Sequence, residues 1–136
     1  MDNIYDLMIE YLRKRGIVAD TDDRKRISFS VNNLHYIFEV FEPDQFFFRM
    51  SLPHITNNTQ ALDQLSDDIQ KLNLNFKVAK IVSQENHELW IVADQFIYST
   101  GQIDSLFERV IQAMGDMIKA YYQIEIQRNN GTEGHQ

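Results

Sequence analysis

The sequence predicts a single α+β domain with the element order α-βββ-α-ββ-α, in which helices pack on an antiparallel five-stranded sheet. Residues 26–52 contain three segments in which apolar and polar residues alternate, and this alternation is typical of half-buried strands. Segments with apolar residues at helical spacing stand before and after them. A length of 136 residues is enough for one domain with its own core.

The first helix is expected over residues 4–15. Asp2 or Asn3 can cap its start, because both side chains accept hydrogen bonds from the first free backbone N–H groups. Gly16 is placed to end it, since glycine readily adopts the positive φ found after many helices. Its apolar stripe comprises Ile4, Leu7, Met8, Tyr11 and Leu12.

Three strands follow at residues 26–31, 34–41 and 45–52. Asn32 and Asn33 form a two-residue turn between the first two strands, because asparagine tolerates positive φ. Residues 42–44 form the second turn and keep Pro43 out of the ladder. Alternation then predicts one continuous apolar face, made of Ile27, Phe29, Val31, Leu34, Tyr36, Phe38, Val40, Phe46, Phe48, Met50 and Leu52.

The second half of the chain predicts a helix over residues 61–72, a hairpin of strands at 76–82 and 88–93, and a long amphipathic helix from residue 103 or 104 onward. We expect the ordered domain to span residues 1–126. Residues 127–136 are polar and aperiodic, which favours a disordered tail.

The opposite side of the predicted sheet mixes polar and apolar side chains. It carries serines and charged groups, as a solvated face should, but also Ile37, Phe41 and Phe47, with Trp90 on the same side. One explanation is that the second helix or a loop covers these residues, or that they stand singly in water. The other is that they form a patch for dimerisation or partner binding. The candidate interaction surface consists of Ile37, Phe41, Phe47, Arg49 and Trp90.

Composition narrows the classes of partner. The net charge of −7 disfavours nucleic acid, because a phosphate backbone would be repelled over most of the surface. The absence of cysteine excludes thiolate metal sites and disulfides. The start of the chain lacks the pattern of a signal peptide, and the apolar runs are too short to span a membrane. We therefore expect a cytoplasmic protein without membrane or nucleic-acid partners.

Motifs for chemistry are missing from the sequence. Asp20 and Asp22 resemble the opening of a calcium loop, but Lys25 stands where that loop needs glycine and Val31 where it needs glutamate. The four histidines have no partner at helical spacing with which to share a metal. No catalytic residue, metal ligand or cofactor is predicted, and an enzyme using His54 or His87 is the weakest hypothesis.

The element order, the acidic charge and the absence of cysteine resemble the type III secretion chaperone-like fold, and within it the YbjN-like bacterial proteins. The likeness extends over residues 3–126: the helix at 4–15, the strands at 27–52, the helix at 61–72, the hairpin at 76–93 and the closing helix. Members of this fold are typically homodimers, and the secretion chaperones bind extended segments of partner proteins. The resemblance therefore implies dimerisation and protein binding.

Two functional hypotheses follow. The first is a non-enzymatic, homodimeric protein-binding module with a chaperone-like or regulatory role, whose mixed sheet face takes a second subunit or a client peptide. The second is a small-ligand sensor with a pocket between the sheet and the closing helix, lined by aromatic residues such as Tyr36, Phe48 and Tyr121. Ordinary core packing is the competing explanation for these three residues.

Overall fold

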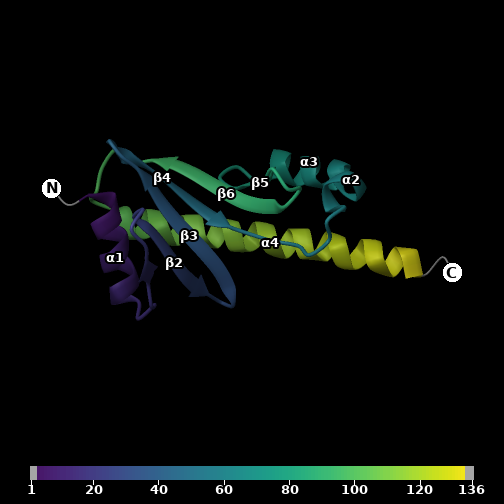
Figure 1. The fold of residues 1–136 in the computed structure, drawn as a ribbon, viewed down its shortest axis with the longest axis horizontal. Helices are drawn as coiled ribbons and strands as arrows, with labels where there is room; N and C mark the ends of the chain where they lie inside the picture. Colours follow the sequence, from purple (N-terminus) through teal and green to yellow (C-terminus); the bar gives the residue numbers. More distant parts are fainter. Residues whose placement is uncertain (1–2, 134–136) are drawn as a thin grey trace.

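In the computed structural model, which describes residues 3–133 and the side chains of residues 3–129, the chain is an α+β domain built on one antiparallel sheet (Figure 1). The helices in this range are α1 (Ile4–Lys14), α2 (Ala61–Gln64), α3 (Ser66–Asn75) and α4 (Ile103–Glu133). The strands are β1 (Asp20–Thr21), β2 (Arg26–Val31), β3 (Leu34–Phe41), β4 (Asp44–Leu52), β5 (Lys80–Ser83) and β6 (Leu89–Phe96), in the sheet order β1-β2-β3-β4-β6-β5.

Helix α4 is the longest element and runs along the sheet. Its C-terminal turns extend past the strands at one end of the molecule, whereas α1 lies at the other end (Figure 1). The ends of α1 form as predicted: the Asn3 side chain accepts a hydrogen bond from the Asp6 N–H at 2.8 Å, and Gly16 follows the helix with φ of +69°.

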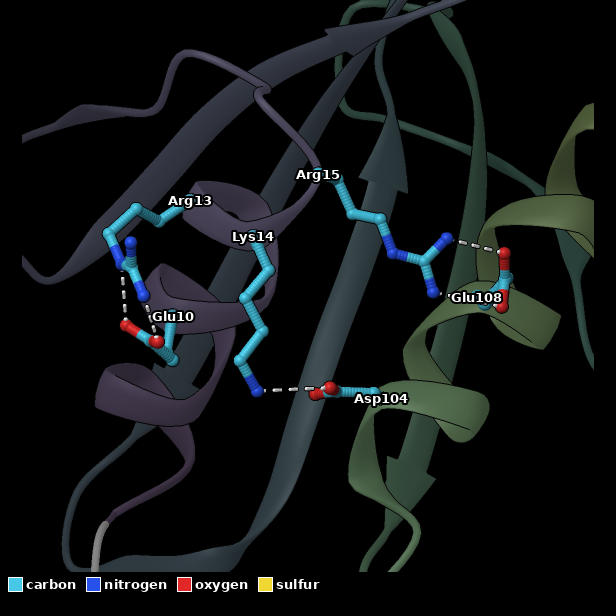
Figure 2. A network of polar contacts seen from close by, with 6 residues as sticks. All are labelled: Glu10, Arg13, Lys14, Arg15, Asp104 and Glu108. Atoms are coloured by element: carbon cyan, nitrogen blue, oxygen red, sulfur yellow. Dashed lines mark hydrogen bonds and ion pairs between the residues drawn. The ribbon is translucent and has the colours of Figure 1, made fainter.

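Ion pairs join the end of α1 to α4. Lys14 lies 3.5 Å from Asp104, and the Arg15 guanidinium donates to both carboxylate oxygens of Glu108 at 2.8 and 3.2 Å (Figure 2). These side chains are exposed, so the pairs contribute little to the stability of the fold.

The core lies between the sheet and helices α1, α3 and α4. The Phe107 ring of α4 contacts the rings of Tyr11, Phe38 and Phe48 at centroid distances of 5.5 to 5.7 Å. The apolar face predicted for the first three long strands is confirmed at its centre, where Phe38 and Phe48 are fully buried. Phe46 is the exception at 50% exposure, because it stands at the end of β4 next to the turn, where the helices leave its ring partly uncovered.

The turns between these strands also follow the sequence. Asn32 and Asn33 have φ values of 53° and 65°, as a two-residue hairpin turn requires. Pro43 lies in the second turn, after a cis peptide bond from Glu42.

The sheet has six strands instead of the predicted five. The additional strand, β1, has two residues and forms because Asp22 closes a tight turn: its carboxylate accepts the backbone N–H groups of Arg24 and Arg26. This turn brings residues 20–21 against Ile27 and Ser28 of β2.

Helix boundaries also differ. The helix predicted over 61–72 is interrupted at Leu65, whose φ of −119° separates α2 from α3. Helix α4 continues to Glu133, so residues 127–133 are helical where a disordered tail was expected; residues 134–136 lie outside the described part of the chain. Arg128 anchors this extension through an ion pair with Asp68 of α3 at 2.8 Å.

Helix α3 lies on the core side of the sheet, where Ile69 and Leu72 are buried together with Ile81 of β5. It also closes the β5 edge: the Asn73 carboxamide donates to the Ile81 carbonyl at 3.0 Å and accepts from the Ile81 N–H at 2.7 Å. The Lys80 ammonium donates to the Asn73 and Phe76 carbonyls at the end of α3. Among the described residues, no helix covers the other side of the sheet.

Candidate functional site

The uncovered side of the sheet carries all five residues of the predicted interaction surface. We call this side the open face and define it by rows of side chains that the strand register places across β3, β4 and β6. Successive rows lie about 7 Å apart along the strands. The register gives the rows Glu39, Arg49 and Asp94, and Ile37, Ser51 and Val92, and it pairs Phe47 with Phe96. Phe41 follows a register shift after Val40 and joins the Phe47 row through contact of the two rings. Trp90 lies on the same side of β6, two residues before Val92.

The first row is a chain of aromatic rings. Phe47 lies between Phe41 and Phe96, at centroid distances of 5.6 and 5.1 Å. Phe41 is 40% exposed and Phe96 is 58% exposed, whereas Phe47 between them is half-buried. Three aromatic rings in contact at the surface form an anchor of the kind that is enriched at protein interfaces.

The second row is charged and lies directly beside the rings. The Arg49 guanidinium donates to both oxygens of Asp94 at 2.7 and 2.9 Å, and its Cζ lies 5.6 Å from the Phe41 ring centroid. The hydrogen bond to Asp94 raises the pKa of Arg49. Glu39 pairs in register with Arg26 and Arg49, but Arg26 binds Asp22 and Arg49 binds Asp94. Within the described part of the chain, Glu39 has no ion pair of its own.

The third row is small and apolar. Ile37 and Val92 are half-buried, and Ser51 between them is fully buried. The Ser51 hydroxyl oxygen has no hydrogen-bond partner among the described side chains and backbone groups. Burial of an unpaired hydroxyl costs stability. The middle of the open face therefore contains a buried hydroxyl group without a hydrogen bond.

Trp90 stands at the far end of the open face. Its indole N–H donates to Glu88 at 3.1 Å, and the His54 ring lies 6.4 Å from the indole. The hydrogen bond from Trp90 is the main reason that the pKa of Glu88 is lowered, with smaller effects from Asn86 and His54. Six residues of an extended strand separate Trp90 from Phe96, a distance of about 20 Å.

The structure therefore brings Phe41, Phe47 and Arg49 into one cluster, places Ile37 one row beyond Arg49, and leaves Trp90 apart at the other end. Their role in binding stays a prediction. Sequence reasoning missed Phe96 and Asp94, because the last strand was predicted to end at Ala93. Continued alternation through residues 94–96 was the signal that would have included them.

The pocket predicted between sheet and closing helix exists in a different form. A groove of about 420 Å3 lies between the last turn of α1, the end of the β2–β3 hairpin and α4. Tyr36 lines this groove, and its hydroxyl donates to the Ile111 carbonyl at 3.3 Å. Phe48 and Tyr121 are fully buried in the core and do not line it.

The remaining sequence hypotheses concern metals and membranes. Within residues 3–129, no three His, Asp or Glu side chains converge as metal ligands would, and His54 and His87 stand at positive φ in separate loops. No helix in the described part of the chain combines the length and the apolar character needed to cross a membrane.

Comparison with known proteins adds evidence about the fold. No protein-family model and no curated protein matches this sequence. Among solved structures, YbjN from E. coli, a suggested transcription regulator, superposes with a TM-score of 0.66 at 10% identity, covering 93% of this chain and 97% of YbjN. The chain has the YbjN fold. The resemblance to YbjN-like proteins inferred from the element order is thus confirmed.

An uncharacterised protein from Methanothermobacter thermautotrophicus is similar as well. It superposes with a TM-score of 0.65 at 8% identity, covering 90% of this chain and 96% of its own. Identities this low show a shared fold with YbjN and with the archaeal protein, and they transfer no site residue.

Proposed function

We propose that this chain is a non-enzymatic protein-binding module with a chaperone-like or regulatory role, and that it acts as a homodimer through the open face. The observation that carries the proposal is the row of contacting rings, Phe41, Phe47 and Phe96, on a sheet face without a helix. The regulatory description of YbjN agrees with such a role.

The size of the exposed apolar surface supports the proposal. A phenylalanine side chain presents about 200 Å2, so Phe41 and Phe96 together expose about 200 Å2. The half-buried Phe47 and Ile37 add to this surface, and an exposed apolar patch of a few hundred Å2 is often functional in a monomer.

The charges of the open face suit a second copy of the same chain. A two-fold interface brings the same patch of both subunits together, so it needs donors and acceptors side by side. Arg49 supplies the cation, and Glu39 one strand away supplies a carboxylate that has no ion pair among the described residues. Arg49 of one copy can therefore bind Glu39 of the other without breaking its own bond to Asp94.

Light scattering after size exclusion tests the proposal. We expect wild-type protein to elute with twice the 16.1 kDa mass of the chain and Phe47→Asp to elute as a monomer, because the new carboxylate would be buried between the rings. Leu74→Asp is the matched control, since Leu74 is 76% exposed on α3, away from the open face. A wild-type monomer at high concentration, or equal behaviour of both variants, would contradict the proposal.

A second candidate function is small-ligand sensing. The observation that favours it is the groove between the β2–β3 hairpin and α4, whose volume of about 420 Å3 falls in the range of ligand pockets. A ligand that binds there without changing the mass in solution would distinguish this function from the first.

A further inference from the structure

We propose that the groove between the β2–β3 hairpin and α4 binds a linear aliphatic carboxylate, with its chain along α4 and its carboxylate at Lys119. This inference rests on the second candidate function, ligand sensing, and names the class of ligand. The groove lies on the helix side of the sheet, so it is separate from the open face.

The shape of the groove selects a linear ligand. Its lining residues on α4 recur every three or four positions, from Glu108 through Gly115 to Tyr122, and so form one straight stripe. That stripe is about 21 Å long. An extended chain can follow such a stripe over its whole length, whereas a compact molecule of the same volume would cover only part of it.

The chemistry of the lining favours an aliphatic chain over a peptide. Val31, Leu34, Ile111 and Ile118 are among the apolar residues that line the groove. The backbone groups of α4 are bonded within the helix, and those of the hairpin at Val31 and Leu34 are paired across the two-residue turn. A bound peptide would therefore have amide groups that lose hydrogen bonds to water and gain few partners, which is unfavourable. An alkyl chain has no polar groups and loses no hydrogen bonds.

Gly115 in the floor of the groove is not explained by the fold. Glycine destabilises a helix interior relative to alanine, and a Cβ at this position would meet the Tyr36 hydroxyl at 3.6 Å, an ordinary contact. The missing side chain leaves space in the middle of the groove, directly below the path of a bound chain.

The charges at the two ends of the groove differ. At one end the Arg15 guanidinium is neutralised by Glu108 (Figure 2). It also lies 5.0 Å from the centroid of the Tyr11 ring. At the other end the exposed Lys119 has no acceptor among the described residues, and Asp116, one turn before it, accepts from Gln112 at 2.9 Å. The unpaired cation is thus at the Lys119 end, which is where a carboxylate is stabilised. On a chain of net charge −7, an anion needs such a local cation.

Octanoate, octanol and octylamine are suitable probes, because they share one chain and differ only in the head group. Binding is measured by calorimetry and located by amide NMR shifts. We expect octanoate to bind more tightly than octanol, octylamine to bind most weakly, and the shifts to cluster at Leu34, Tyr36 and Gly115. Equal affinities of octanoate and octanol at these residues would keep the ligand site but refute the carboxylate class. Shifts elsewhere, or none, would refute the site itself.

Three variants sharpen the test. Lys119→Gln should weaken octanoate about threefold, the effect of a partly exposed ion pair, and leave octanol unchanged. Arg109→Gln is the matched control, because Arg109 is an exposed cation on α4 that lines a different groove. Gly115→Leu should abolish binding of both probes, and Gly115→Ala should weaken both while raising the melting temperature. An unchanged octanoate affinity in Lys119→Gln would overturn the placement of the carboxylate.

Discussion

Replacement of Asn73 tests how the β5 edge of the sheet is closed. The Asn73 carboxamide forms two hydrogen bonds with Ile81, one as donor and one as acceptor. Each is worth about 0.5 to 1.5 kcal/mol net, so Asn73→Ala should lower the free energy of unfolding by about 1 to 3 kcal/mol. Because the variant also exposes a strand edge, it should self-associate more readily at high concentration.

Asn73→Asp separates the two bonds. The carboxylate can still accept from the Ile81 N–H, but only the protonated acid can donate to the Ile81 carbonyl. At neutral pH an aspartate is ionised, so the variant keeps the bond from the Ile81 N–H and places a carboxylate oxygen against the Ile81 carbonyl. It should therefore be less stable than wild type at neutral pH.

Urea unfolding at neutral pH provides the measurement. Asn75→Ala is the control, because Asn75 is exposed at the last position of the same helix. The reasoning is refuted if Asn73→Ala costs no more than Asn75→Ala, or if Asn73→Asp is as stable as wild type at neutral pH.

Three further predictions concern the core, the groove and the helix contacts. Phe107→Ala should cost about 3 to 5 kcal/mol in denaturant unfolding, because it removes a fully buried ring that contacts three others. Burial raises the pKa of Tyr36 to about 12, so the stability that Tyr36 contributes should fall as the pH rises above about 10. Tyr36→Phe should reduce this loss of stability in alkaline unfolding experiments. An unchanged pH profile in the variant would contradict the prediction. Glu108→Gln should change the melting temperature only slightly at low salt and not at all at high salt, since its pair with Arg15 is exposed.

Much of the fold could be predicted because the two periodicities in the chain are clear. Alternation placed Phe38 and Phe48 in the core, and the three- and four-residue spacing found α1 and α4. The two-residue strand β1 could not be found in this way, because it depends on the hydrogen bonds of one side chain, Asp22. The exposure of Phe46 was not predicted, because alternation shows on which side of the sheet a residue lies but not how far the helices extend over that side.

The candidate site was predictable only in part for the same reason. The alternation of side chains along β3 and β4 was sufficient to group Ile37, Phe41 and Phe47 on one side. Whether that side is covered depends on where α3 packs, and its stripe of Ile69 and Leu72 would suit either face of the sheet. The groove at Gly115 could not be predicted either, because a glycine in a helical pattern does not show which element packs against it.

The geometry of the sheet leaves few ways for a partner to bind. At one edge, Asn73 occupies the backbone groups of β5 that an added strand would need. At the other edge, β1 already pairs with β2 at Ile27 and Ser28, which leaves a short stretch before the hairpin turn. Strand addition therefore has little room, and helices fill the core side. What remains is the open face and, behind the same hairpin, the groove. Strand β3 contributes to both, because Tyr36 points toward the groove and its neighbour Ile37 lies on the open face. A ligand in the groove thus lies one residue along the strand from the proposed dimer surface.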